Sequence, residues 1–312
     1  MIRRRKKLNV VIQNNRQINI SLKYPKLMKF KKKIADKLAN LLTVSELSIL
    51  PRGFQTLGDV IILKLKPELL NKKEIIGKAY MELLPSIKSV YINRGKITGE
   101  FREPENIEFL AGVDDPIVDH KEHGITYRFD ITKIMFSKGN LKERKTLATF
   151  VKEGEIIVDM FAGIGYFSLP IGKHSSVDKI YSIELNPNSF NALVGNIKIN
   201  HLEEKIVAIN GDCKEEVLKL SDSGIRADRV IMGVFPAPLN YIKEALTLTK
   251  EEGSVFHFEG VVEKENHVSL FDDFNAVAKD QHYTCELKSF RLVKSYGPNL
   301  YHVVLDIFVL KN

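Results

Sequence analysis

Two glycines, Gly163 and Gly165, separate a short apolar run from a segment with helical spacing, and this arrangement constrains the fold more than any other part of the chain. Residues 154–158 have the apolar, β-branched character of a buried parallel strand. Residues 166–173 place apolar side chains at helical intervals. A strand, a glycine turn and a helix in this order form the nucleotide-binding turn of a doubly wound sheet, so the chain is predicted to contain an α/β domain of that class.

The acidic residue Glu184 stands where a ribose-binding carboxylate is expected. It ends a predicted strand at residues 179–184 and follows Gly165 by nineteen residues. At this spacing a carboxylate can accept hydrogen bonds from the two hydroxyls of a ribose. The three-glycine pattern of NAD-binding turns is not met, because Ser168 occupies the third glycine position.

Further acidic positions make the turn resemble the S-adenosylmethionine site of class I methyltransferases. Asp159 precedes the glycine pair, and Asp212 and Cys213 follow a third predicted strand at residues 206–210. The resemblance implies that Asp159 receives the ammonium of the methionine part, that Glu184 binds the ribose, and that Asp212 and the Cys213 amide border the adenine. The glycines would let the backbone approach the ligand closely. Asp159 could instead have a structural role.

The length and composition indicate the class of protein. A chain of 312 residues with 44% hydrophobic residues can form two domains. No apolar run approaches the about 18 residues of a membrane span, and no apolar segment of a secretory signal follows the basic start of the chain. Cys213 and Cys285 form neither a disulfide framework nor a metal-ligand pattern. We expect a cytoplasmic monomer without a metal or membrane partner.

The basic residues are concentrated at the N-terminus. Residues 1–50 hold 13 Lys and Arg against Asp36 and Glu46, a net charge of +11, whereas the whole chain carries +8. The remainder is therefore slightly acidic. This asymmetry favours a polyanionic partner, most simply a nucleic acid, over a solvated lysine-rich surface.

Three regions are predicted: a basic N-terminal segment at 1–45, a small α+β domain at 46–112 and an S-adenosylmethionine-binding catalytic domain at 113–312. The first two regions are expected to contain strands within 8–22, helices at 26–42 and 72–84, and strands at 59–65 and 90–92. In the large domain, strands and helices alternate and end in an antiparallel hairpin. Its other predicted elements are helices at 141–150, 215–220, 239–249 and 271–280, and strands at 228–233, 254–258, 285–294 and 301–310.

Four short segments point to a narrower family. They read Gly-Asp-Val-Ile at 58–61, Ile-Thr-Gly-Glu-Phe-Arg at 97–102, Phe-Ser at 136–137 and Asp-Met-Phe-Ala-Gly-Ile-Gly at 159–165. From about residue 50 to the end, the chain resembles a group of tRNA-modifying enzymes that act on the nucleotide 3′ of the anticodon. The group includes tRNA guanine-N1 methyltransferases and the archaeal and eukaryotic tRNA(Phe) 4-demethylwyosine aminocarboxypropyltransferases of the wybutosine pathway.

Two places separate these two branches. The guanine methyltransferases follow Phe-Ser with Pro-Arg and end the fourth strand with Asn-Leu-Pro, whose Asn side chain can meet a base edge. Here Lys-Gly-Asn occupies 138–140, and Gly233 stands at the end of the fourth strand. These residues, with Tyr-Gly-Pro at 296–298 and His-Val-Val-Leu-Asp at 302–306, resemble the aminocarboxypropyltransferases.

The resemblance implies a reaction and further cofactor contacts. The 3-amino-3-carboxypropyl group of S-adenosylmethionine would pass to C7 of 4-demethylwyosine in the anticodon loop of tRNA(Phe), releasing methylthioadenosine. By the family pattern, Ser137 and Arg144 would also bind the cofactor. From the sequence alone Ser137 could merely cap the following helix, and Arg144 could lie on the surface of that helix. No catalytic base stands out, since His257 between two Phe residues is more typical of a core or sheet-edge residue.

Three functions remain open at this point. The first is aminocarboxypropyl transfer, and the second is N1-methylation of guanosine at the same tRNA position. The third is a non-catalytic RNA-binding protein on the same fold, which would have no need of Gly163, Gly165, Glu184 and Asp212. Cofactor binding separates the third from the others, and the identity of the transferred fragment separates the first from the second.

Overall fold

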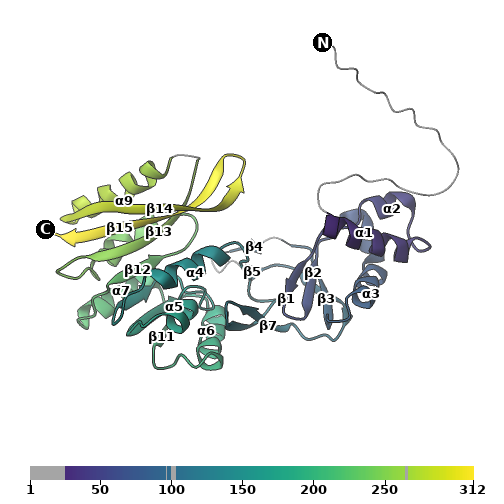
Figure 1. Cartoon of the computed structure of the whole chain (residues 1–312), viewed down its shortest axis with the longest axis horizontal. Helices are drawn as coiled ribbons and strands as arrows, with labels where there is room; N and C mark the ends of the chain where they lie inside the picture. Colours follow the sequence, from purple (N-terminus) through teal and green to yellow (C-terminus); the bar gives the residue numbers. More distant parts are fainter. Residues whose placement is uncertain (1–24, 96, 100–102, 264–265) are drawn as a thin grey trace, which may run out of the picture.

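The computed structural model describes residues 25–95, 97–99, 103–263 and 266–312. A large α/β domain and a small α+β domain lie at opposite ends of the described chain (Figure 1). The strands predicted within residues 8–22 lie outside the described residues. No helix of the described part has both the length and the apolar character needed to cross a membrane.

The large domain alternates strands and helices around one seven-stranded sheet. Its strands are β9 (Ile156–Asp159), β10 (Lys179–Glu184), β11 (Ile206–Asn210), β12 (Arg229–Met232), β13 (Ser254–Glu263), β14 (Tyr283–Gly297) and β15 (Leu300–Lys311). Its helices are α4 (Leu141–Phe150), α5 (Ser168–His174), α6 (Pro187–Ile199), α7 (Cys213–Asp222), η2 (Leu239–Tyr241), α8 (Ile242–Leu246) and α9 (His267–Asp280).

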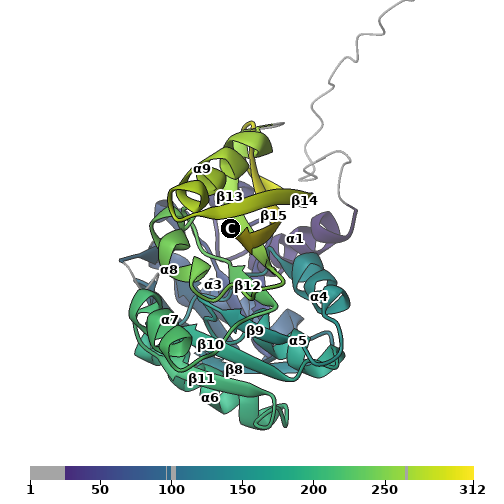
Figure 2. The ribbon, with the colours of Figure 1, turned by 90° about the vertical axis from the view of Figure 1, so that its left-hand side faces the viewer.

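The sheet has the strand order β11-β10-β9-β12-β13-β15-β14. The first five strands are parallel, and β15 runs antiparallel to both of its neighbours. Helices α7, α8 and α9 cover one face, and α4 and α5 cover the other (Figure 2). This is the doubly wound sheet with an antiparallel terminal hairpin that the sequence predicts, and the strand order reverses between β9 and β12, where such folds place their ligands.

The small domain is a four-stranded sheet with helices on one face. Its elements are α1 (Pro25–Leu38), α2 (Val44–Ser48), β1 (Gln55–Leu57), β2 (Val60–Leu63), η1 (Pro67–Lys72), α3 (Lys73–Leu83), β3 (Ser89–Asn93), the short pair β4 (Ile97–Thr98) and β5 (Glu103–Pro104), and β6 (Ile107–Gly112). The sheet order is β1-β2-β3-β6.

Both faces of the small sheet are buried, which explains the unbroken apolar run of β2. Ile61 and Leu63 pack with α1 and α3, whereas Val60 and Ile62 pack in the core of the large domain. Ile34 of α1 belongs to the small-domain core. We therefore propose that α1 and α2 be counted with the small domain, although the sequence suggested a boundary at residue 45.

A hairpin that the sequence analysis did not predict joins the domains. It consists of β7 (Ile117–Glu122) and β8 (Ile125–Asp130). His123 and Gly124 both have positive φ, as the tightest hairpin turns require. The side-chain oxygen of Asn196, on α6, accepts a hydrogen bond from the Arg128 amide. The Asn200 side chain accepts from the amide of Thr126 and donates to the carbonyl of the same residue.

Helix α6 was also not predicted from the sequence, and several other differences concern element ends. The helix predicted at 26–42 ends at Leu38, and the one predicted at 239–249 divides into η2 and α8. The strand predicted at 254–258 continues to Glu263, because β15 pairs along its whole length. The bounds of β10, β11 and α4 are those predicted.

Candidate active site at the carboxyl edge of the sheet

A cavity of about 310 Å³ opens where β9, β10, β11 and β12 end. Six of the eight residues predicted to bind the cofactor line this cavity. They are Ser137, Arg144, Gly163, Glu184, Asp212 and Cys213. Gly165 and Asp159 do not line it.

The two glycines have different roles. Gly163 has a φ of +58° and lines the cavity, and its amide donates to Glu184 Oε2 at 2.7 Å. Gly165 has a φ of +96°, and a Cβ there would lie 2.6 Å from Leu169 Cγ. Gly165 therefore permits close packing of the turn on α5, and only Gly163 is placed to approach a ligand.

Glu184 ends β10 and presents a carboxylate that is already held in place. Its Oε1 accepts a hydrogen bond from the amide of Asn186 at 2.8 Å, and its Oε2 accepts from Gly163. Burial raises the pKa of the Glu184 carboxyl above its ordinary value, against the opposing effect of these backbone donors. The remaining lone pairs can accept the hydroxyls of a ribose.

Asp212 and Cys213 begin α7 on the neighbouring side of the cavity. Asp212 caps the helix by accepting from the Lys214 amide at 2.8 Å. Burial raises the pKa of the Cys213 thiol to about 12, so the sulfur stays protonated. Two aromatic residues that the sequence analysis missed, Phe161 and Tyr241, also line the cavity and contact each other edge to face. Together these groups can hold a flat, apolar base.

Arg144 lies deep in the cavity wall and is only 2% exposed, so the surface position that the sequence left open is wrong. Its guanidinium donates to Glu122 Oε2 at 2.6 Å and to the carbonyl of Ser137. It also lies over the Tyr166 ring, 4.4 Å from the centroid. Its Nε has no hydrogen-bond partner among the described residues, so one donor remains available for a ligand.

A chain of hydrogen bonds connects Arg144 to the small domain. Glu122 pairs with His120 Nε2 at 3.0 Å, and His120 Nδ1 accepts from the amide of Gly58 in the turn between β1 and β2. Although burial acts to raise the pKa of Glu122, His120 and Arg144 hold it below the ordinary value. A Cβ at Gly58 would lie 2.6 Å from the Asp119 carbonyl oxygen, so this contact requires glycine.

Asp159 is fully buried below the cavity. Its Oδ2 accepts from Ser168 Oγ at 2.6 Å, and Ser182 in turn donates to Ser168. The geometry therefore favours the structural alternative for Asp159 over a contact with the ammonium of a ligand. Burial raises the pKa of its carboxyl to about 7.

Asp159→Asn is expected to flatten the pH dependence of stability. A carboxyl whose folded-state pKa is raised binds protons better in the folded state, so its contribution falls as pH rises from its unfolded pKa of roughly 4 through about 7. Urea unfolding across this window should show the free energy of unfolding declining less steeply in the variant. Equal slopes for the two proteins would mean that Asp159 does not titrate there.

The end of β12 supplies space rather than a side chain. Gly233 lines the cavity, and a Cβ there would lie 2.9 Å from Phe167 Cε2 and 3.5 Å from the Glu259 carboxyl carbon. An Asn at this position would have to displace the Phe167 ring. Behind Gly233, Glu259 pairs with the buried His302 at 2.9 Å.

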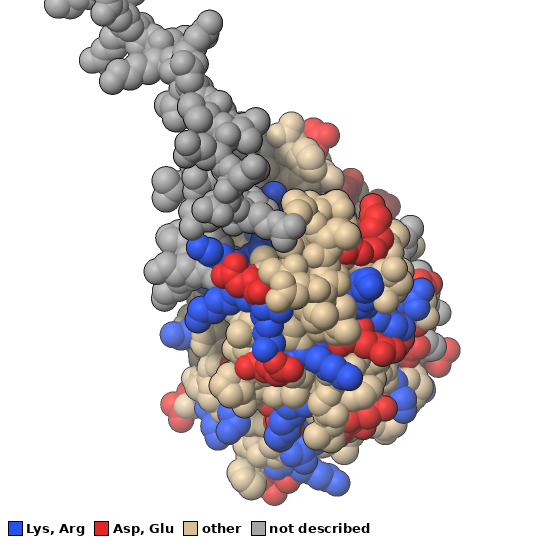
Figure 3. Space-filling model, turned by 90° about the vertical axis from the view of Figure 1, so that its right-hand side faces the viewer, with Lys and Arg blue, Asp and Glu red and all other residues tan. Residues whose placement is uncertain are grey.

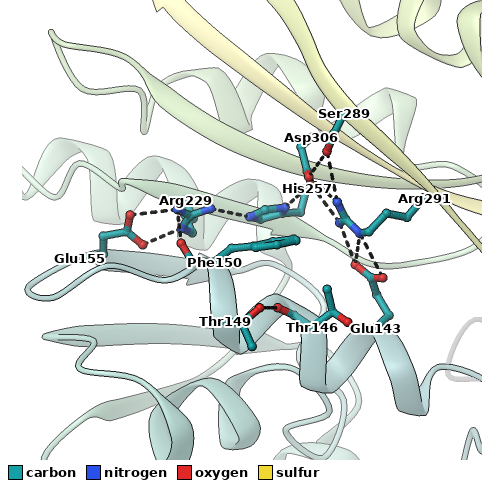
Figure 4. Close-up of polar contacts among 10 residues, drawn as sticks. All are labelled: Glu143, Thr146, Thr149, Phe150, Glu155, Arg229, His257, Ser289, Arg291 and Asp306. Atoms are coloured by element: carbon teal, nitrogen blue, oxygen red, sulfur yellow. Dashed lines mark hydrogen bonds and ion pairs between the residues drawn. The ribbon is translucent and has the colours of Figure 1, made fainter.

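Helix α4, which carries Arg144, is fixed by a buried polar network (Figure 4). Near its start, Glu143 accepts from Arg291 of β14, which also pairs with Asp306 of β15. At its end, the Phe150 carbonyl accepts from Arg229 Nη2 at 2.6 Å. His257 connects the two halves through Asp306 and Arg229, so it is a core residue, as the sequence favoured.

Comparisons with known proteins agree with this geometry. The TRM5/TYW2 methyltransferase domain matches residues 118–286, and the TYW2 N-terminal domain matches residues 34–115. The chain is 37% identical over 283 residues to the tRNA(Phe) (4-demethylwyosine(37)-C(7)) aminocarboxypropyltransferase of Pyrococcus horikoshii, covering 90% of this chain and 98% of that protein. The chain belongs to the TRM5/TYW2 family. The predictions of fold and family are thus confirmed.

Both branches of the TRM5/TYW2 family are represented among the relatives. The tRNA (guanine(37)-N(1))-methyltransferase Trm5b of Methanocaldococcus jannaschii is 33% identical over 262 residues, which cover 83% of this chain and 71% of that protein. The crystal structure of P. horikoshii TYW2 in complex with MeSAdo matches with a TM-score of 0.76 at 34% identity, covering 90% of this chain and all of that one. Membership of the TRM5/TYW2 family alone therefore leaves the transferred group to be argued from the site.

Proposed function

We propose that this protein transfers the 3-amino-3-carboxypropyl group of S-adenosylmethionine to C7 of 4-demethylwyosine, 3′ of the anticodon in tRNA(Phe). The observation that carries the proposal is Gly233 at the cavity end of β12, where a guanine-reading Asn would meet the Phe167 ring. In addition, the P. horikoshii relative named as an aminocarboxypropyltransferase of this specificity aligns with the chain over 98% of its own length.

The cavity residues fit this cofactor. Glu184, Gly163, Asp212 and Cys213 line one cavity, so Glu184 and Gly163 would hold the ribose and the sugar–methionine junction, and Asp212 and Cys213 would border the adenine. The unpartnered Nε of Arg144 offers a donor to the methionine end. We propose that Ser137, Arg144, Gly163, Glu184, Asp212 and Cys213 contact the cofactor, with Gly165 and Asp159 shaping the turn beneath it.

The chemistry depends on which carbon of the sulfonium faces the acceptor. When bound, S-adenosylmethionine supplies an electrophilic γ-carbon: the bond from C7 to this carbon forms, the carbon–sulfur bond breaks, methylthioadenosine leaves with the electron pair, and C7 loses its proton. The residues of the chain orient the reactants, because the carbon held in line with the nucleophile reacts. Arg144 is suited to this task since Glu122, Ser137 and Tyr166 fix its guanidinium.

Guanosine N1-methylation is the second candidate. It shares the scaffold and has a relative at 33% identity. The cavity disfavours it, because Gly233 offers a base edge neither a donor nor an acceptor on a side chain. Incubation of the protein with labelled cofactor and tRNA carrying 4-demethylwyosine, followed by nucleoside mass spectrometry, tests the first proposal. Addition of the aminocarboxypropyl mass supports it, and addition of a methyl group would refute it.

The RNA partner is proposed to meet the small domain and the basic N-terminal segment. Lys and Arg side chains occur across the end of the molecule that the small domain forms, mixed with acidic ones (Figure 3). Lys31 lies close enough to Arg52 and Lys66 that, after burial, their charges lower its pKa. Such a group of cations suits phosphate contacts.

Deletion of residues 1–24 is expected to weaken tRNA binding without affecting cofactor affinity. It removes seven basic residues and leaves Ile34 and the small-domain core in place. Because each phosphate contact releases counterions, the variant should bind tRNA with a shallower salt dependence and a higher KM. Filter binding across a salt series measures the slope, and S-adenosylmethionine affinity serves as the control. An unchanged slope would assign these residues to solvated surface.

A further inference from the structure

A short arm of the small domain reaches the large domain beside the cavity. Strands β4 and β5 lie between β3 and β6 in the sequence, but they pair with each other rather than with the four-stranded sheet. They lie where the two domains meet (Figure 1). Glu103, the first residue of β5, brings a carboxylate from this arm to the large domain.

The Glu103 carboxylate accepts hydrogen bonds from two asparagine side chains at the start of α6. Its Oε1 lies 3.0 Å from Asn188 Nδ2 and 3.3 Å from Asn186 Nδ2. The partners are 85 and 83 positions away in the sequence, so these bonds join the two domains. Because the acceptor is a carboxylate, they belong to the stronger, charge-assisted class of hydrogen bond.

Asn186 connects Glu103 to the carboxylate of Glu184. The Asn186 Oδ1 caps α6 by accepting from the Asn188 amide at 2.8 Å, while its Nδ2 donates to Glu103. The backbone amide of Asn186 donates to Glu184 Oε1 at 2.8 Å. Asn186 is only 3% exposed. Because close-packed interiors transmit strain, a buried residue fixed in this way would pass a disturbance at Glu103 on to Glu184.

The same segment forms one wall of the cavity. Glu184, Leu185 and Ser189 line the cavity, and Asn186 lies among them in the sequence. Glu103 itself is not one of the described residues that line it. Any effect of Glu103 on a ligand therefore acts through the segment that it holds.

We propose that Glu103 is a positioning residue for the cofactor, which orients the Glu184 carboxylate toward the ribose hydroxyls by holding Asn186. An acceptor that is fixed before the ligand arrives loses less freedom when the ligand binds, so the small domain contributes to cofactor affinity. The assignment rests on the role of Glu184 in the proposed function.

Titration calorimetry with two nucleosides tests the positioning role. Adenosine has both ribose hydroxyls, whereas 2′,3′-dideoxyadenosine has the same base and lacks them. Glu103→Ala should weaken adenosine binding by roughly five- to tenfold, as expected for the loss of about one hydrogen bond, and leave dideoxyadenosine binding unchanged. Glu103→Gln keeps an acceptor oxygen and should bind adenosine nearly as the wild type does.

Glu74→Ala is the matched control for Glu103→Ala. It removes an exposed carboxylate from α3 of the same domain and should leave both affinities unchanged. Thermal unfolding followed by circular dichroism verifies that each variant is folded.

Two results would overturn the proposal. Equal weakening for both nucleosides in Glu103→Ala would show that Glu103 supports the cavity wall in general rather than the ribose contact. Wild-type adenosine affinity in this variant would show that Glu184 is oriented without it. Glu184→Ala separates this inference from the proposed function. If adenosine affinity falls in Glu184→Ala but not in Glu103→Ala, only the positioning role fails, whereas no loss in Glu184→Ala would refute the proposed ribose site itself.

Discussion

Glu184→Ala is expected to lower affinity for S-adenosylmethionine by about a hundredfold or more. The carboxylate accepts hydrogen bonds from the amides of Gly163 and Asn186. In the proposed function it would also accept hydrogen bonds from two ribose hydroxyls. Hydrogen bonds to a charged group contribute on the order of 1.5–3 kcal/mol each, so losing two of them accounts for that factor. Isothermal titration calorimetry measures the change directly.

Two further variants make this result specific. Glu184→Gln keeps an acceptor of similar size and should lose less affinity than the alanine variant. Glu203→Ala removes an exposed carboxylate from the same domain and should bind like the wild type. Thermal unfolding monitored by circular dichroism verifies that the variants are folded. Wild-type affinity in a folded Glu184→Ala protein would place the adenosine elsewhere.

Arg291→Met is expected to cost about 3–5 kcal/mol of folding free energy, because it leaves buried carboxylates without their cation. Arg291 Nη2 lies 2.7 Å from Glu143 Oε1 and 2.9 Å from Asp306 Oδ1 (Figure 4). Glu143 and Asp306 are only 5% and 8% exposed. Equilibrium unfolding in urea measures the loss.

Arg128 provides the matched control for Arg291. It forms a bidentate salt bridge with Asp119, in which Nε lies 2.6 Å from Oδ1 and Nη2 lies 2.5 Å from Oδ2. Both side chains of this salt bridge are largely exposed. Arg128→Met should therefore cost at most about 1 kcal/mol. Similar losses for the two variants would mean that the network around α4 contributes no more than a surface ion pair.

Local pattern predicts the core of the large domain well. The strands β10 and β11 and the helix α4 have the predicted bounds, because parallel core strands and amphipathic helices are encoded by neighbouring residues. The β7–β8 hairpin was missed, although His123-Gly124 between two alternating runs is a turn signal. Its short, half-exposed strands resemble a linker until the contacts with α6 are known.

Part of the candidate site could be predicted from motif spacing, whereas its contacts between residues distant in the sequence could not. Motif spacing predicted that Glu184, Asp212 and Gly163 meet at one cavity, since each lies at or just after the carboxyl end of a predicted strand. The same spacing could not tell that Asp159 bonds to Ser168 below the turn. Glu143 and Arg291 are 148 positions apart, so only the fold brings them together.

The most direct test of the account is chromatography of the spent cofactor after reaction of the wild-type protein with tRNA carrying 4-demethylwyosine and, separately, with guanosine-containing tRNA. If the cavity holds the γ-carbon toward the acceptor, the first reaction should release methylthioadenosine with little S-adenosylhomocysteine. Guanosine tRNA should be a poor acceptor, since Gly233 offers no side chain to the guanine edge. S-adenosylhomocysteine as the main product with guanosine tRNA would identify a methyltransferase and contradict the account.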